Sequence, residues 1–116
     1  IKVDAGSDGR HSEAPPMPQV GDRVCRGEKP APAYGLTGER FDGDSVKLSW
    51  TKSPVSHDKQ LVIYGRTPEN LEYAYPEELG SDVQSVDVNG ADWGNVYFSV
   101  GTWKGDCIMW SLVGDP

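Results

Sequence analysis

Short segments in which apolar and polar residues alternate place the strongest constraint on the fold of this chain. In residues 45–51, single polar residues separate the apolar residues Val46, Leu48 and Trp50. A period of two indicates a strand with one buried face, because successive side chains of a strand point to opposite sides. No window of eleven or more residues has the 3.6-residue period of a helix. The sequence therefore predicts an all-β fold.

Several such strands are predicted, each bounded by residues that favour turns. We expect them at 36–41, 45–51, 60–66, 71–75, 83–88, 96–101 and 107–113. Asp42-Gly43-Asp44, Asn89-Gly90 and Lys104-Gly105-Asp106 are turn sequences between neighbouring strands. Six or seven short strands at this spacing are typical of an antiparallel β-sandwich.

The aromatic residues divide the chain into two parts. All eleven lie at Tyr34 or beyond, whereas five of the nine prolines lie in residues 1–34. A segment without aromatic residues buries too little apolar surface to offset the entropy lost on ordering. We therefore expect an extended Pro/Gly-rich N-terminal arm or linker over residues 1–31 and one sandwich domain over residues 32–116.

The charge of the chain argues against two classes of partner. The net charge is −7, and all of it lies in residues 35–116, because positive and negative charges balance in residues 1–34. Binding to nucleic acid requires clustered Lys and Arg, which this chain lacks. No apolar run approaches the roughly 20 residues that a membrane-spanning helix needs. We expect neither a nucleic-acid partner nor a membrane span.

No group of residues in the sequence has the spacing of a catalytic or metal site. Glu77 and Glu78 are adjacent on a chain expected to be extended, so they point to opposite faces and cannot flank one scissile bond. The segment 4–9 is similar to the start of a calcium loop, but the twelfth position counted from Asp4 is Pro15 instead of a bidentate Glu. His11 and His57 have no partner at zinc-ligand spacing. We predict no enzymatic activity, no metal and no cofactor.

The two cysteines, Cys25 and Cys107, leave three alternatives open: a disulfide, two buried thiols, or half of a shared metal site. The absence of a C-x-x-C pair makes a zinc site the weakest of these. A disulfide is the favoured interpretation if the protein is extracellular, because disulfides persist in oxidising compartments.

The order and spacing of several residues resemble the fibronectin type III domain. Residues 32–50 are similar to the P-x-x-x-L…G-x-S-V-x-L-S-W pattern of the first two strands of that family. Residues 64–71 resemble the Y-G-x-x-P-x-x-L turn of its extracellular microbial members, and Val96-Tyr97-Phe98 fits its sixth strand. The resemblance covers about residues 32–113. It implies a seven-stranded antiparallel sandwich of immunoglobulin-like topology, with Trp50 in the core.

The resemblance also has consequences for the cysteines and for one tyrosine. In this fold the chain enters at the pole that carries the last loop, so Cys25 is expected near Cys107. A disulfide between them would leave residues 1–24 to reach outward. The chain departs from the family at the tyrosine corner, which usually continues the inward face of the sixth strand. Here the alternation places Phe98 and its apolar neighbours inward and leaves Tyr97 on the other face.

An outward apolar patch is predicted on one sheet of the sandwich. If Val62 faces the core, Leu61 and Ile63 lie on the outer face, and Tyr97 and Met109 are expected to join them. A patch of this size is larger than solubility favours, so we expect the arm or a partner to cover it. The alternative is scattered surface residues without a role.

Two further candidate binding sites are weaker. Trp93, Trp103, Tyr73 and Tyr75 are candidates for stacking on a glycan, although they are expected on different loops. The resemblance draws attention to Lys104-Gly105-Asp106, because some fibronectin type III modules display Arg-Gly-Asp in the same loop to bind integrins. A plain hairpin turn is the alternative for this tripeptide.

These features predict a non-enzymatic extracellular structural and interaction module. It would assemble with neighbouring copies or other chains in a surface fibre, adhesin or virion surface structure, through its arm and its sheet face. Cell-surface adhesion is part of this hypothesis. The alternative is an accessory spacer or weak glycan-binding module of a secreted polysaccharide-degrading or phosphatase enzyme. Because this type of sandwich hosts many binding roles, fold alone does not select between the two.

Overall fold

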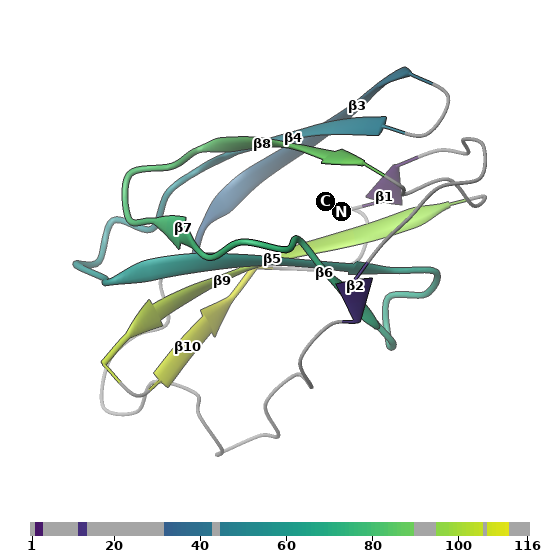
Figure 1. The fold of residues 1–116 in the computed structure, drawn as a ribbon. Helices are drawn as coiled ribbons and strands as arrows, with labels where there is room; N and C mark the ends of the chain where they lie inside the picture. The colour runs from purple at the N-terminus through teal and green to yellow at the C-terminus, as the bar shows by residue number, and fades with distance from the viewer. Residues whose placement is uncertain are drawn as a thin grey trace.

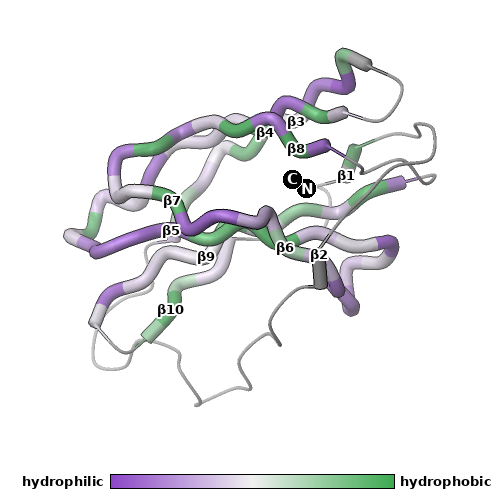
Figure 2. Tube along the Cα trace, in the orientation of Figure 1, coloured by the Kyte–Doolittle hydropathy of each residue, from purple (hydrophilic) through white to green (hydrophobic). Residues whose placement is uncertain are grey.

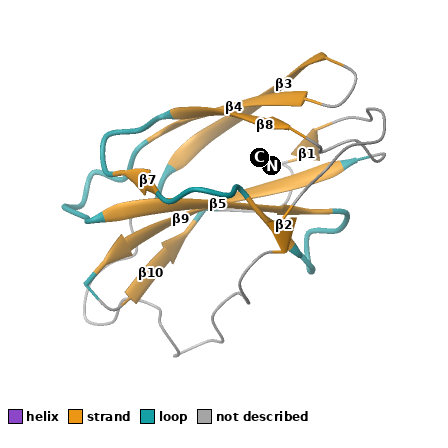
Figure 3. Cartoon of the chain, viewed as in Figure 1, coloured by secondary structure: helices purple, strands orange, loops and turns teal. Residues whose placement is uncertain are grey.

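Strands, turns and irregular loops make up the described chain. The computed structural model describes residues 2–3, 12–13, 32–42, 45–89, 95–105 and 107–111. None of these residues belongs to a helix that could cross a membrane (Figure 3). Within these ranges the strands are β1 (Lys2–Val3), β2 (Ser12–Glu13), β3 (Tyr34–Asp42), β4 (Ser45–Thr51), β5 (Lys59–Gly65), β6 (Tyr73–Ala74), β7 (Leu79–Gly80), β8 (Ser85–Asn89), β9 (Val96–Lys104) and β10 (Cys107–Trp110).

The strands form two antiparallel sheets that face each other (Figure 1). The smaller sheet has the order β3-β4-β8. The larger sheet has the order β1-β9-β5-β6-β2, with β10 also paired to β9 and β7 also paired to β5. The predicted all-β sandwich is confirmed. The three short strands β1, β2 and β7 were not predicted.

The smaller sheet follows the alternation in the sequence closely. In β4, Val46, Leu48 and Trp50 are buried, and the residues between them are exposed or half-buried. Val86 and Val88 of β8 lie opposite Leu48 and Val46 on the same inner face. Hydrophobic and hydrophilic residues alternate along these strands in Figure 2. The outer face of this sheet is polar, with Lys47 between Glu39 and Asp87 on the neighbouring strands, as shown by the strand register.

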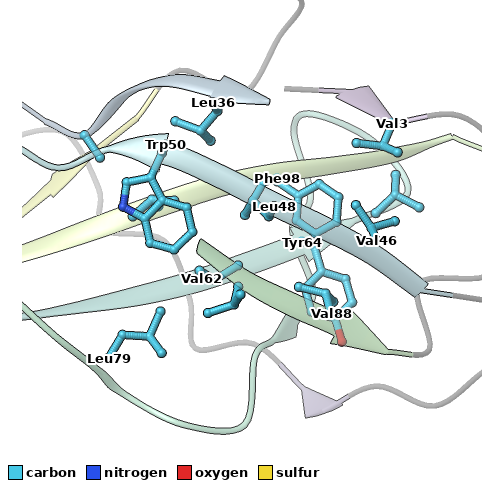
Figure 4. Close-up of a cluster of buried hydrophobic side chains, with 14 residues drawn as sticks. Val3, Leu36, Val46, Leu48, Trp50, Val62, Tyr64, Leu79, Val88 and Phe98 are labelled. Carbon is cyan, nitrogen blue, oxygen red and sulfur yellow. The ribbon is translucent and has the colours of Figure 1, made fainter. Parts of the chain in front are cut away.

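The main core lies between the two sheets (Figure 4). The larger sheet contributes Val62 and Tyr64 of β5 and Val96, Phe98 and Val100 of β9. The rings of Tyr64 and Phe98 are 5.6 Å apart between centroids and tilted by 35°. The predicted inward alternation of β9 is confirmed, and Tyr97 points away from this core.

A buried polar network joins the sheets near one end of the core. The indole N–H of Trp50 donates to Oε1 of Gln60 over 2.9 Å. The Gln60 amide nitrogen donates to the backbone oxygens of Gly80, at 2.9 Å, and Val83, at 2.7 Å. Gln60 is fully buried, so one side chain connects β4, β5 and the segment that leads from β7 into β8.

The turn after β5 explains the glycine of the Y-G-x-x-P-x-x-L pattern. Residues Thr67 and Asn70 form an isolated bridge, and the Asn70 N–H donates to the Thr67 oxygen over 3.2 Å. A Cβ atom at Gly65 would lie 2.3 Å from the backbone oxygen of Asn70. Only a residue without a side chain permits this close return of the chain.

Strand β3 is an edge strand of the smaller sheet among the described residues, and its pairing is irregular. The register with β4 shifts between Tyr34 and Thr37 and again between Arg40 and Asp42. Tyr34 and Phe41, near the two ends of β3, are 55% and 54% exposed. Register shifts in an edge strand hinder pairing with a foreign strand.

Replacing Gln60 should test how much the polar network contributes to stability. Gln60→Ala leaves the Trp50 N–H and two backbone oxygens without their partner, so we expect the free energy of unfolding to fall by at least about 2 kcal/mol. Urea denaturation measures this loss. The control is Gln84→Ala, because Gln84 is exposed and its side-chain oxygen accepts from the backbone N–H of Lys52, whereas its backbone bond to Trp50 survives the substitution. Equal losses for the two variants would contradict a structural role for the network.

Candidate interaction surface

A second apolar cluster lies on the outer face of the larger sheet. Ile63, Leu71 and Ala74 are buried in it, and Leu61, Tyr97 and Trp110 are half-buried against them. We call these six residues the outer cluster. They come from β5, β6, β9, β10 and the turn after β5. The cluster forms here because β5 is apolar on both of its faces. The two sheets therefore differ, since the outer face of the smaller sheet is polar.

The centre of the outer cluster depends on a glycine. Gly101 of β9 lies between Leu61 of β5 and Trp110 of β10 in the strand register. A Cβ atom at Gly101 would lie 2.8 Å from Cζ3 of Trp110 and 3.1 Å from Cγ2 of Ile108. The indole thus occupies the space that a side chain at position 101 would need.

The structure places three of the four residues of the predicted partner surface on one face. Leu61, Ile63 and Tyr97 lie together in the outer cluster. Met109 does not belong to this face. Ile108 and Trp110, its neighbours in β10, both approach the outer side of Gly101, so Met109 points inward beside Thr102, its partner in the register. Alternation showed which residues of β10 share a face, but it could not show which face is inside.

Burial limits which of these residues can meet a partner. Ile63 is 0% exposed and Met109 is 4% exposed. Leu61, Tyr97 and Trp110 are half-buried and form the part of the outer cluster that solvent reaches. Whether this surface binds a partner stays a prediction.

Two segments of the N-terminal arm pair with opposite edges of the larger sheet. In β1, Lys2 lies opposite Tyr97 and Val3 opposite Val96. In β2, Ser12 lies opposite Ala74 and Glu13 opposite Tyr73. The expectation that residues 1–24 reach outward is therefore wrong for these segments. The expectation fails because the backbone groups of these segments pair with strand edges of the same domain. The pattern of apolar and polar side chains does not reveal such backbone pairing.

The edge of β9 that β1 joins is shared with β10. Beyond Trp110, the Ser111 N–H donates to the Val100 oxygen over 3.0 Å, and the Val100 N–H donates to Oγ of Ser111 over 2.8 Å. Ser99 is also buried, and its hydroxyl donates to the Ser111 backbone oxygen over 3.0 Å. These bonds extend the β9 pairing from β10 towards β1.

Of the residues expected to stack on glycans, the three that the structure describes do not share one platform. Tyr73 and Tyr75 pack against the main core. Trp103 lies at the far end of β5 from Tyr73, since Trp103 is opposite Lys59 and Tyr73 is opposite Tyr64.

The face of Trp103 is already in contact with a cation. The Lys59 ammonium is 5.2 Å from the ring centroid of Trp103 and also 2.5 Å from a carboxylate oxygen of Glu78. Trp93 lies outside the described residues. Glycan stacking stays a prediction.

The Lys104-Gly105-Asp106 loop is tied to the strand connection before β5. The Gly105 N–H donates to a carboxylate oxygen of Asp58 over 3.0 Å, and the Asp58 N–H donates to the Trp103 oxygen over 2.8 Å. Lys104 is half-buried and Gly105 exposed, whereas Asp106 lies outside the described residues. A receptor-binding role for this loop remains untested.

The cysteine prediction can be followed at Cys107 only. Cys107 is half-buried at the start of β10, and its Sγ lies 3.0 Å from the Lys104 oxygen. The described residues include no free cysteine. Cys25 lies outside the described residues, so the Cys25–Cys107 disulfide stays a prediction.

A polar contact that sequence reasoning missed connects two loops near β7. Both ring nitrogens of His57 lie near backbone oxygens, that of Val55 at 2.6 Å and that of Ser81 at 2.8 Å. Beside it, the hydrogen bond from Lys52, together with the charges of Lys52 and His57, lowers the pKa of Asp82 below its usual value. The Lys52–Asp82 pair is exposed, so it adds little to stability. The described ranges hold no group of three or more His, Cys, Asp or Glu that could bind a metal ion.

Comparison with known proteins rests on structure alone. No family model and no curated protein sequence matches the chain. A fibronectin type III domain of human collagen XX superposes with a TM-score of 0.60 at 16% identity, covering 72% of this chain and 86% of that one. The chain has a fibronectin type III-like fold. A computer-redesigned β-sandwich protein superposes with a TM-score of 0.54 at 15% identity over the same shares. At these identities the likeness shows the fold.

Adding a single methyl group at Gly101 should disturb the outer cluster. Gly101→Ala forces the Trp110 indole and Ile108 to move, so we expect a loss of about 1–3 kcal/mol in the free energy of unfolding. The near-ultraviolet circular dichroism of the tryptophans should change as well. Gly80→Ala is the matched control, because the nearest atom to its added Cβ is Cγ2 of Val83 at 4.0 Å. Similar spectra and stabilities for both variants would contradict the packing described here.

Proposed function

We propose that this chain is a non-enzymatic extracellular interaction module. It assembles with neighbouring copies of itself or with neighbouring chains, as part of a surface fibre, adhesin or virion surface structure. The fibronectin type III-like fold supports a binding role over a catalytic one. The observation that carries the proposal is the pairing of two arm segments with opposite edges of the larger sheet.

Edge pairing of this kind suits assembly for a physical reason. Main-chain hydrogen bonds between strands depend little on side-chain identity, so a strand-like arm can extend any accessible sheet edge. The solvent-reaching part of the outer cluster lies beside the edge that β1 joins, because Tyr97 belongs to both. A neighbour docked there would gain apolar contacts in addition to backbone pairing.

The extracellular setting rests on the fold and on the cysteines. The described residues include no free cysteine, which favours a bonded Cys107. A disulfide between arm and domain would hold the arm's second half at the sandwich and would persist in an oxidising compartment.

Deleting the arm should abolish assembly. We expect the full chain to self-associate with rising concentration, and the chain without residues 1–24 to stay monomeric, as measured by light scattering coupled to size exclusion. Because the deletion also removes Val3 from the core, circular dichroism must show that the shortened chain is folded. A synthetic peptide of residues 1–13 gives an independent measurement, since an excess of it should dissociate assemblies of the full chain. An unchanged oligomer in both experiments would contradict the proposal.

The predicted disulfide can be tested separately from assembly. Under non-reducing conditions, intact-mass spectrometry should show the loss of two hydrogens, and no thiol should react with a maleimide. Cys25→Ser should lower the free energy of unfolding by about 2–4 kcal/mol, because the denatured chain is no longer cross-linked. The control is the same comparison under reducing conditions, in which the difference should vanish. Two reactive thiols in the native chain would show the prediction to be wrong.

A further inference from the structure

The start of β9 has an edge that β10 does not reach. Strand β10 pairs with β9 from Gly101 to Lys104, and Ser111 continues this edge to Val100. Further along β9, beyond Ser99 and Phe98, Tyr97 and Val96 pair with β1 instead. The site that accepts β1 is therefore a short stretch of strand edge, bounded on one side by the end of the β10 pairing.

The same site takes an apolar side chain into the main core. Val3 is 6% exposed and belongs to the main core cluster, and its partner Val96 is 0% exposed. Strand β1 also contacts β3 of the smaller sheet. Figure 4 shows Val3 at the Val46 end of the cluster, away from Trp50. The arm thus supplies a side chain that closes one end of the sandwich.

We propose that the β9 edge at Val96–Tyr97 accepts Lys2–Val3 of a second copy of this chain, so that copies join by exchanging β1. This inference rests on the proposed function and names the site and the partner for it. The occupant is a second copy because the segment shown to fit the site belongs to this sequence. Another copy offers the same residues in the same register.

Exchange between copies preserves every contact that β1 makes within one chain. The balance between pairing within one chain and exchange between copies then depends on the local concentration of each β1 segment around the acceptor. Thirty residues separate Val3 from Tyr34, and Ser12–Glu13 within this stretch pair with β6. A segment tethered to its own acceptor reaches an effective concentration on the order of millimolar. Copies held side by side on a surface reach similar local concentrations. Serial exchange then yields an open chain of copies, whereas reciprocal exchange yields a closed dimer.

Cysteine trapping tests the exchange at a defined register. Lys2 and Tyr97 lie opposite each other in the β1–β9 pair, so cysteines at these positions are close enough to be joined. Lys2→Cys and Tyr97→Cys are prepared as two separate variants, mixed at about millimolar concentration and oxidised mildly. One aliquot is kept native throughout, and another is unfolded and refolded together before oxidation. Because each variant carries only one new cysteine, a link between positions 2 and 97 must join two chains.

The expected result is a shift from monomer to covalent dimer in either aliquot, with peptide mass spectrometry locating the link at positions 2 and 97. The control mixes Lys2→Cys with Lys47→Cys, whose position on the outer face of β4 is exposed. It should give only traces of dimer. The double variant Lys2→Cys/Tyr97→Cys, diluted, reports the link within one chain.

Strand exchange is overturned if neither aliquot links positions 2 and 97 between chains, or if the control dimerises equally well. Light scattering on the unmodified chain separates this failure from that of the proposed function. Assembly without the link between chains would refute the exchange and leave the proposed function standing. A monomer at every concentration would refute both.

Discussion

The hydrogen bond between Trp50 and Gln60 is the contact on which the alignment of the two sheets depends. Apolar contacts between facing sheets are not directional, and they tolerate small shifts. The hydrogen bond from the Trp50 indole is directional, and losing the Gln60 acceptor would leave its N–H without that partner in the core. Gln60 adds two bonds from its amide nitrogen to backbone oxygens around β7. One side chain therefore aligns both sheets and fixes the path that the chain takes into β8.

Much of the sandwich can be predicted from residue alternation. Residues 45–51 and 96–100 alternate cleanly, and their apolar members are buried in the main core. The alternation also decided correctly against an inward Tyr97, although the family resemblance favoured a tyrosine corner. This success has a physical basis, since burying Ser99 and Gly101 in place of Phe98 and Val100 would leave the core poorly filled.

The features that sequence reasoning missed depend on contacts between distant segments. Met109 was placed on the wrong face because alternation within β10 is symmetrical, and only the register with β9 decides which side faces the core. Gln60 is a polar residue at the start of the strand expected over residues 60–66. Its position in register with Val62 and Tyr64 was the one available sign that it points inward. Val3 gave no sign at all, since two paired residues leave no period in a sequence.

The candidate surface was predictable in part for the same reason. Leu61, Ile63 and Tyr97 follow from the apolar outer side of β5 and from the alternation of β9. Trp110 joins the cluster because its indole occupies the space that a side chain at position 101 would need. Only the pairing of β9 with β10 shows that Trp110 and Gly101 are neighbours. The outer face of β5, which alternation alone predicts to be exposed, is therefore mostly covered by side chains from the neighbouring strands.

The two register shifts in β3 have a consequence for how this domain can grow into larger structures. Between the shifts, regular pairing with β4 extends from Thr37 to Arg40. A foreign strand added at that edge could follow only these four residues before the register shifts. At the β3 edge, the smaller sheet therefore offers an intruding chain only a short stretch of regular backbone. In the larger sheet, the proposed acceptor at Val96–Tyr97 is two residues long, and Val3 is the side chain that it takes into the core.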